Sequence, residues 1–334
     1  MTATEPATAA ETPAVRRLAV LGRVGEARNL GLVVVLGLLV IVGVITAPGL
    51  FLTWSNILNI LTTASVIGVV TVGMTFVIIS GGIDLSVGAI IALASVWCTT
   101  LETQSYGIGA MIFAALVVGT AAGLVNGALI AYARMVPFIV TLAMYVSARG
   151  LAEQISGRKS QIVNDTSFAE IAFHKVLGLP ILVVILAVVT VLGWLLLNRT
   201  TFGRRTFAVG GNAAAARLAG IDVRRHTLLV YLLSGACCGI GAIMLTALTN
   251  TGASTHGMLY ELDAIAAVVI GGTLLSGGRG TIVGTVFGVM IFTTLNNVFT
   301  LNNLSISAQS VAKGLIIVIA VLLQQRLAAR ATAP

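Results

Sequence analysis

The sequence predicts an all-α, polytopic membrane protein with about ten transmembrane helices, and three observations support this fold class. Of the 334 residues, 57% are hydrophobic and only 9% are charged, whereas soluble domains average roughly 25% charged residues. Long apolar runs recur along the chain, which has a mean hydropathy of +1.05. The cationic residues gather on one predicted side of a membrane. So little charge cannot cover a water-facing surface, which excludes an ordinary soluble enzyme, a disordered chain and a nucleic-acid-binding protein.

The apolar runs define the expected elements in order. A helix of about 20 apolar residues crosses a bilayer, and ten runs reach or approach that length. They cover residues 30–47, 57–79, 85–101, 109–131, 137–155, 181–197, 228–248, 264–275, 281–299 and 308–323. The eighth run is short and rich in glycine. We therefore expect a broken or re-entrant helix there, and nine to eleven spans in all.

Small residues recur at four-residue intervals on several of these runs. Gly119 and Gly123 share one face of the fourth run, and Gly235 and Gly239 share one face of the seventh. Faces of this kind let helix backbones approach closely in a bilayer. We expect close helix packing there rather than a lining for substrate.

The distribution of cationic residues predicts the orientation. Fourteen of the 19 Lys and Arg residues fall in segments on the side of the N-terminus, three fall on the other side, and Arg149 and Lys313 fall within spans. Cytoplasmic loops carry the excess of Lys and Arg in membrane proteins. Residues 1–29 and 326–334 are therefore predicted to be cytoplasmic tails that flank a transmembrane domain at 30–325.

Three charged residues inside the spans need partners, because an isolated charge in a bilayer is costly. Arg149 and Glu153 are four positions apart in the fifth run, so we expect an intrahelical ion pair. Lys313 lies in the last run and requires either a partner or a water-filled cavity.

Residues 80–88, Ser-Gly-Gly-Ile-Asp-Leu-Ser-Val-Gly, interrupt two apolar runs. The two glycines break the helix, and Asp84 and Ser86 are residue types that cap a new helix. One interpretation is a broken helix beside a transport path, and another is a tight turn before a capped helix. The two interpretations are compatible.

A second segment, residues 276–284, repeats the pattern Ser-Gly-Gly-x-x-x-x-Val-Gly and is a candidate internal repeat. Gly272 and Gly277 have the spacing of a nucleotide-binding loop. However, Gly278 and Arg279 stand where that motif needs Lys and Ser or Thr. We therefore expect no ATP binding by this chain.

The longest predicted cytoplasmic loop, residues 198–226, contains a short helix. Asn212 is a good N-cap, the alanine-rich run 213–219 favours a helix, and Gly220 can end it. A helix with such small side chains suits insertion into a groove on a partner protein. The alternative is a helix that lies on the membrane surface, where its arginines bind anionic lipid.

Four segments together resemble one family. Similarity to the membrane permeases of ribose-type ABC importers is found, in chain order, at residues 73–88, residues 137–144, the loop 203–221 and residues 267–273. The resemblance extends over about residues 30–325. It implies a multi-pass permease of the bacterial cytoplasmic (inner) membrane that transports a monosaccharide and is not itself an enzyme.

The same resemblance implies the partners. Two permease chains, identical or paralogous, would form the pathway in the membrane lipid. Two ABC ATPase subunits, or one fused double ATPase, would bind the loop 198–226 as a coupling loop. An extracytoplasmic sugar-binding protein would deliver the solute. No cofactor, metal, catalytic residue or nucleic acid is implied.

The resemblance also assigns residues to these roles. The implied coupling contacts are Gly203, Gly210, Gly211, Asn212, Ala215, Arg217, Gly220 and Ile221. The implied motif beside the pathway consists of Gly81, Gly82, Asp84, Ser86 and Gly88. Many relatives carry Glu near Ala213 or Ala214, so the alanines here put a salt bridge to the ATPase in doubt, but not the docking of the helix.

Polar residues inside the spans are candidates to line the pathway through transient hydrogen bonds with sugar hydroxyls. They are Asn59, Thr62, Thr63, Ser65, Asn126, Thr141, Asn296 and Asn297. Hydrogen bonding between helices is the competing interpretation of each residue.

Three other functions are alternatives to a monosaccharide importer. An ion-coupled secondary transporter would act alone, but the acidic residues that cation coupling needs are scarce near the spans. This interpretation also leaves the coupling helix unexplained. A membrane-embedded enzyme lacks any recognisable catalytic motif here. A related ABC permease for an autoinducer, a nucleoside or a branched-chain amino acid also fits the resemblance.

Overall fold

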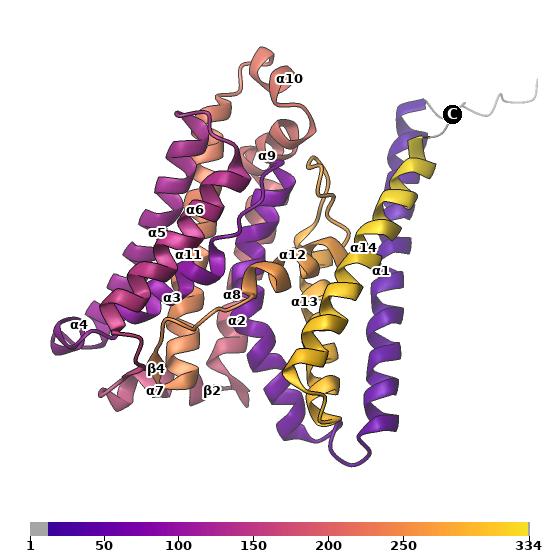
Figure 1. Ribbon diagram of the computed structural model, residues 1–334. Coiled ribbons are helices and arrows are strands. Elements are labelled where there is room, and N and C mark those ends of the chain that lie inside the picture. The colour runs from indigo at the N-terminus through magenta and orange to yellow at the C-terminus, as the bar shows by residue number, and fades with distance from the viewer. Residues whose placement is uncertain (1–12, 333–334) are drawn as a thin grey trace, which may run out of the picture.

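The computed structural model describes residues 13–332, and most of this part of the chain is helical (Figure 1). The helices are α1 (Pro13–Thr46), α2 (Trp54–Ile79), α3 (Val87–Cys98), α4 (Leu101–Ser105), α5 (Ile108–Ala131), α6 (Pro137–Ser156), α7 (Thr166–Phe173), α8 (Ile181–Arg199), α9 (Thr201–Gly211), α10 (Ala213–Leu218), α11 (Val223–Thr249), α12 (Tyr260–Ile270), α13 (Ile282–Leu301) and α14 (Ile306–Thr332). Two small antiparallel sheets pair β1 (Gln161–Ile162) with β4 (Thr251–Gly252), and β2 (Lys175–Val176) with β3 (Leu179–Pro180).

Each of the ten apolar runs corresponds to a helix. Five helices in the described part of the chain, α2, α5, α8, α11 and α13, are long and apolar enough to cross a membrane. Helices α3 and α12 have 12 and 11 residues, which is about half of what a span requires. The expected all-α membrane protein is thereby confirmed, and the eighth run is indeed a short helix.

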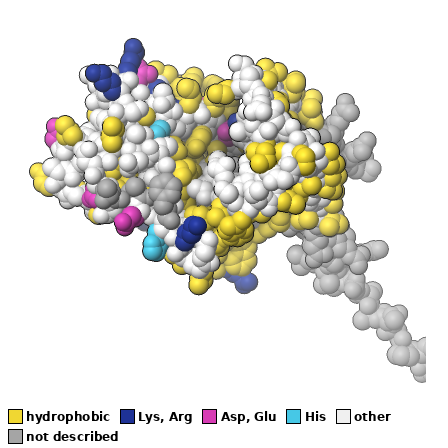
Figure 2. Space-filling model, turned by 90° about the horizontal axis from the view of Figure 1, so that it is seen from below, with side chains coloured by type: hydrophobic (Ala, Val, Ile, Leu, Met, Phe, Trp, Pro, Cys, Tyr) yellow, Lys and Arg dark blue, Asp and Glu magenta, His cyan; other side chains and the backbone are white. Residues whose placement is uncertain are grey.

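Helix α2 lies at the centre of the bundle, and most of its residues after Ala64 are buried. It is surrounded by α8, α11, α12 and α13. Large apolar side chains are exposed on the outer helices, including α1, α5, α6, α8 and α14, as a lipid-facing surface requires. Figure 2 shows apolar side chains along the flanks of the molecule, seen from the end that carries α4 and α7.

Glycines bring α5 and α11 into backbone contact. A Cβ atom at Gly119 would lie 2.8 Å from the Gly239 Cα, and one at Gly235 would lie 2.8 Å from the Gly123 Cα. These distances leave no room for a side chain, so the close packing predicted for the two small-residue faces is confirmed.

The two ends of the bundle differ. One end carries α9 and α10, and α1 begins and α14 finishes on this same end (Figure 1). The other end carries α4, α7 and the small sheets. The β1–β4 pairing ties the segment after α6 to the end of α11, with Gln161 opposite Gly252.

The predicted ion pair between Arg149 and Glu153 is wrong. Glu153 pairs instead with Arg158, at 2.9 Å between Oε2 and Nε. Arg149 donates from Nη1 to the carbonyls of Ser254 and His256 in the segment between α11 and α12. Arg149 thus ties α6 to a distant connection, which residue spacing within one helix does not reveal.

Candidate functional site

The Ser-Gly-Gly segment after α2 breaks the helix as expected. Ser80 caps α2, Gly81 adopts a φ of 85° that favours glycine, and α3 begins six residues later at Val87. Gly82 faces Tyr231 of α11, and a Cβ there would lie 3.3 Å from the Tyr231 Cζ. Gly88 in the first turn of α3 packs against the backbone of Gly257. The chain therefore turns tightly between two helices in the interior of the bundle.

Asp84 anchors this break through neutral partners. Its Oδ1 accepts hydrogen bonds from the Ser86 backbone N–H at 2.9 Å and from the Ser86 hydroxyl at 2.5 Å. Its Oδ2 accepts from the Ser234 hydroxyl of α11 at 3.1 Å. Asn126 of α5 donates to the Ser86 hydroxyl at 2.9 Å. Asp84 and Ser86 therefore join the break to α5 and α11.

The expected capping of α3 differs in detail. Ser86 is the N-cap residue, but its side chain makes no cap hydrogen bond because the hydroxyl donates to Asp84. Both interpretations of the segment hold in part, since the helix is broken and the break is a tight, hydrogen-bonded turn. Its place beside a transport path stays a prediction.

The second Ser-Gly-Gly segment lies directly against the first. Gly277 and Gly278 have φ angles of 83° and 74°, so the first glycine of each segment adopts the same conformation. The Gly278 backbone N–H donates a hydrogen bond of 2.9 Å to the Ile79 carbonyl at the end of α2. A Cβ at Gly277 would lie 3.0 Å from the Gly81 Cα. The repeated sequence thus forms a pair of turns in contact.

A third glycine segment completes this contact. Gly210, at the end of α9, packs so closely on the Ile79 carbonyl that a Cβ would collide with it. That Cβ would also lie 2.8 Å from the Gly278 backbone nitrogen. We call this contact of Gly81, Gly210, Gly277 and Gly278 the glycine junction. It joins the 198–226 loop to both Ser-Gly-Gly turns through backbone atoms alone.

The 198–226 loop contains two helices rather than the one short helix expected. Residues 198–211, which lack a long apolar run, form the end of α8 and the whole of α9. Helix α9 is fixed to the bundle by Thr206, whose hydroxyl lies 3.0 Å from the His226 Nε2 of α11, and by Phe202, whose ring centroid lies 4.7 Å from that of His226. Helix propensity misses α9 because packing on α8 and α11 stabilises it.

The predicted short helix is α10. The Asn212 side chain caps it by accepting from the Ala215 N–H at 2.9 Å, and Gly220 follows with a φ of 81°. Of its residues only Ala216 is buried, and Leu218 is 91% exposed. Helix α10 therefore protrudes from the end of the bundle (Figure 1).

The eight implied coupling residues differ in burial. Gly203 is buried against the Leu197 backbone, and Gly210 lies in the glycine junction. Five others are exposed on or beside α10, and Ile221 is half-buried. The exposed five are Gly211, Asn212, Ala215, Arg217 and Gly220.

Most of the candidate lining residues are not brought together. The Ser65 hydroxyl donates to the Leu61 carbonyl at 2.6 Å within α2, and Asn126 binds Ser86. The Asn297 and Asn56 side chains exchange two hydrogen bonds. The Thr62 hydroxyl donates to Leu58, and that of Thr141 to Pro137; Asn59 is exposed.

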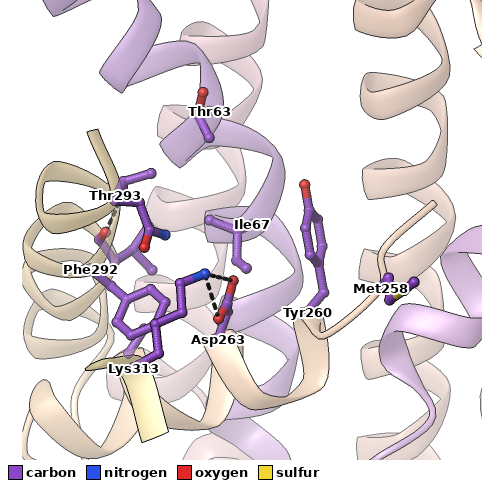
Figure 3. A pocket seen from close by; sticks show the side chains of 11 residues that line it. Thr63, Ile67, Met258, Tyr260, Asp263, Phe292, Thr293 and Lys313 are labelled. Carbon is purple, nitrogen blue, oxygen red and sulfur yellow. Dashed lines mark hydrogen bonds and ion pairs between the residues drawn. The ribbon is translucent and has the colours of Figure 1, made fainter. Parts of the chain in front are cut away.

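Two of the candidates, Thr63 and Asn296, line a cavity of about 260 Å³ between α2, α12, α13 and α14 (Figure 3). Asp263 of α12 and Lys313 of α14 line one side of it and form an ion pair, at 3.4 Å between Oδ2 and Nζ. The partner expected for Lys313 is therefore Asp263, and the expected cavity is also present. Nothing in the sequence pairs Lys313 with Asp263 in particular, although a lysine within a span is itself a signal that an acidic partner exists.

Comparisons with known proteins agree with the resemblance in the sequence. The model of the family described as "Branched-chain amino acid transport system / permease component" matches residues 56–321. The ribose import permease protein RbsC of Bacillus subtilis is 42% identical over 278 residues, which cover 83% of this chain and 86% of that protein. The Escherichia coli K12 protein of the same name is 38% identical over 280 residues, covering 83% and 87%.

A third relative has another sugar in its name. The D-allose transport system permease protein AlsC of Escherichia coli K12 is 35% identical over 282 residues, covering 84% of this chain and 86% of that protein. No solved structure matches the chain significantly. From the family match, these relatives and the apolar helices, it follows that the chain belongs to the ribose-type permeases of ABC importers and is a multi-pass protein of the inner membrane.

Proposed function

We propose that this chain forms half of the translocation pathway of an ABC importer for a monosaccharide. In this proposal residues 30–325 form the pathway domain with ten spans, and the tails 1–29 and 326–334 lie in the cytoplasm. A second permease chain completes the pathway, and an extracytoplasmic binding protein delivers the sugar. Two ATPase domains bind the 198–226 loop and hydrolyse ATP, which the permease itself does not do.

The glycine junction is the observation that supports this function best. Helix α10 is exposed and offers its small side chains to a partner, and it follows directly after Gly210 and Gly211. Gly210 touches the end of α2 and the connection between α12 and α13 without any flexible side chain between them. A displacement of α10 by an ATPase would therefore move the centre of the bundle directly.

The orientation of the chain ends agrees with this proposal. Figure 1 places the start of α1 and the finish of α14 at the end of the bundle that carries α10. The charge pattern predicts that this end is cytoplasmic, because the arginines of 198–226 and of both tails fall there. The ATPases would then bind on the side where ATP is present.

The named relatives favour a neutral sugar as the solute. Ribose, D-allose and galactofuranose occur in the names of permeases that are 34–42% identical to this chain. We propose a monosaccharide of this size, with D-ribose as the first to test. Branched-chain amino acids appear in the description of the broader family.

Co-purification tests this function. The chain is expressed with the ATPase subunit of a ribose importer, and the purified complex is assayed for ATP hydrolysis with and without a ribose-loaded binding protein. We expect a stable complex whose hydrolysis rises when the loaded binding protein is added. A chain that associates with no ATPase would contradict the proposal.

A further inference from the structure

The cavity between α2, α12, α13 and α14 combines a pair of opposite charges with a buried polar atom that has no hydrogen-bond partner among the described residues. Asp263 and Lys313 are only 13% and 21% exposed at their side chains. The Asn296 Oδ1 is buried and has no hydrogen-bond partner among the described residues. A buried acceptor without a partner costs about 1–3 kcal/mol, so a hydroxyl group that donates to this amide oxygen would stabilise it.

We propose that this cavity is a transient binding subsite for one neutral, polyhydroxylated solute, a monosaccharide. The inference rests on the proposed importer function and adds to it where the solute binds within the permease. The cavity lies between segments on either side of the second Ser-Gly-Gly turn, since α12 precedes that turn and α13 follows it. A displacement of the glycine junction would therefore also displace α12 and α13, which form two walls of the subsite.

The charges favour a neutral ligand. Asp263 repels an anion and Lys313 repels a cation, while the two charges together sum to zero. Their separation of 3.4 Å is longer than the roughly 2.7–2.9 Å of a strong charge-assisted hydrogen bond. Both groups therefore retain hydrogen-bonding capacity for ligand hydroxyls, because a carboxylate accepts at four lone-pair sites and an ammonium donates three protons.

The remaining walls suit a sugar. The Lys313 Nζ lies 5.3 Å from the centroid of the Phe292 ring, so an apolar surface adjoins the charged groups. Tyr260 and Thr63 place hydroxyl-bearing side chains on other sides of the cavity (Figure 3). A mostly apolar cavity with a few convergent polar groups is the usual form of a small-molecule site.

The size of the cavity also fits. Pockets for drug-sized ligands have volumes of about 300–1,000 Å³, and this cavity has about 260 Å³. It therefore lies just below that range, which suits a solute smaller than a drug molecule, such as a pentose or hexose.

The main test is Asn296→Leu in the complete complex of permease, ATPase and binding protein in proteoliposomes. Replacing an unpartnered buried acceptor by an apolar side chain of similar size should not destabilise the fold. We expect radiolabelled D-ribose uptake to fall at least about tenfold, as when a hydrogen-bonding site is lost. ATP hydrolysis stimulated by the loaded binding protein should persist. Unchanged uptake would overturn the subsite.

The double variant Asp263→Leu/Lys313→Leu separates binding from structure. Replacing both partners of a buried ion pair by apolar residues is often neutral or stabilising, so a purely structural pair predicts normal melting temperature and normal uptake. We expect a normal melting temperature with strongly reduced uptake. A normal uptake rate would overturn the subsite. Lys175→Met, on exposed β2, is the control for removal of a lysine and should retain uptake.

The two proposals fail in different ways. If the wild-type complex takes up no sugar although it assembles, the importer function itself is contradicted. If the wild-type complex transports D-ribose and the cavity variants do so at the same rate, only the subsite is contradicted.

Discussion

The Gly278 backbone N–H donates a hydrogen bond of 2.9 Å to the Ile79 carbonyl, and this bond joins two turns that share the sequence Ser-Gly-Gly. Gly210 packs against the same carbonyl from the 198–226 loop. Three connections far apart in the chain thus meet through their backbones.

Gly210→Val should disrupt the glycine junction. A Cβ at this position collides with the Ile79 carbonyl, and overpacking of this kind costs about 1–3 kcal/mol. We expect a lower melting temperature and weaker stimulation of ATP hydrolysis by the binding protein. The neighbouring Gly211 has nothing within 4 Å of an added Cβ, so Gly211→Ala should melt like the wild type. Equal melting temperatures for both variants would argue against the junction.

Gly123→Val should separate α5 from α11. Its Cβ would meet the backbones of Tyr231 and Gly235, and neither backbone can withdraw without moving a whole helix. The expected loss of stability is about 1–3 kcal/mol or more, measured as denaturation in detergent. Gly109→Ala is the matched control in the same helix, because nothing lies within 4 Å of its added Cβ. Tolerance of valine at Gly123 would show that the helices do not touch there.

Asp84→Ala should be far more harmful than Asp84→Asn. Alanine leaves the Ser86 N–H and the Ser86 and Ser234 hydroxyls without their acceptor, at about 1–3 kcal/mol for each unsatisfied group. Asparagine retains an acceptor oxygen and the same shape, and its amide can donate to Ser234. Thermal denaturation of the purified variants measures which of the two is less stable. If both variants were equally damaging, the negative charge rather than the hydrogen bonding would be the essential property.

Arg149→Met should loosen the segment between α11 and α12. The arginine donates to two carbonyls there, those of Ser254 and His256, and methionine cannot replace either bond. We expect faster hydrogen exchange of residues 253–259 and reduced sugar uptake. Arg158→Met removes an arginine whose side chain is 81% exposed, and surface ion pairs contribute only about 0–1 kcal/mol. Residues 253–259 of that control should exchange at the rate of the wild type. Equal exchange rates in both variants would show that Arg149 does not hold this segment in place.

Most of the fold follows from the sequence because the signals are local. Runs of apolar residues predict the helices, and small residues at four-residue spacing predict the contact between α5 and α11. The turn at Gly81 and the cap at Asn212 are also local, since each depends on conformational preferences of a few neighbouring residues.

The parts that the sequence analysis missed depend on contacts between distant segments. Helix α9 forms because Thr206 and Phe202 pack on His226 of α11. Arg149 binds carbonyls more than a hundred residues away, which spacing along one helix does not suggest. Of the candidate lining residues, Asn296 and Asn297 are adjacent in the sequence, yet one faces the cavity and the other binds Asn56. Their environments differ because the two side chains point in different directions around the axis of α13.

Sugar uptake into proteoliposomes is the most direct test of the importer function. The chain is reconstituted with its ATPase, and uptake of radiolabelled D-ribose is measured with ATP on the side of α10 and ribose-loaded binding protein on the other side. We expect uptake only when the ATPase, ATP and the binding protein are all present. Uptake by the chain alone under an ion gradient, with no ATPase, would contradict the importer function and favour a secondary transporter.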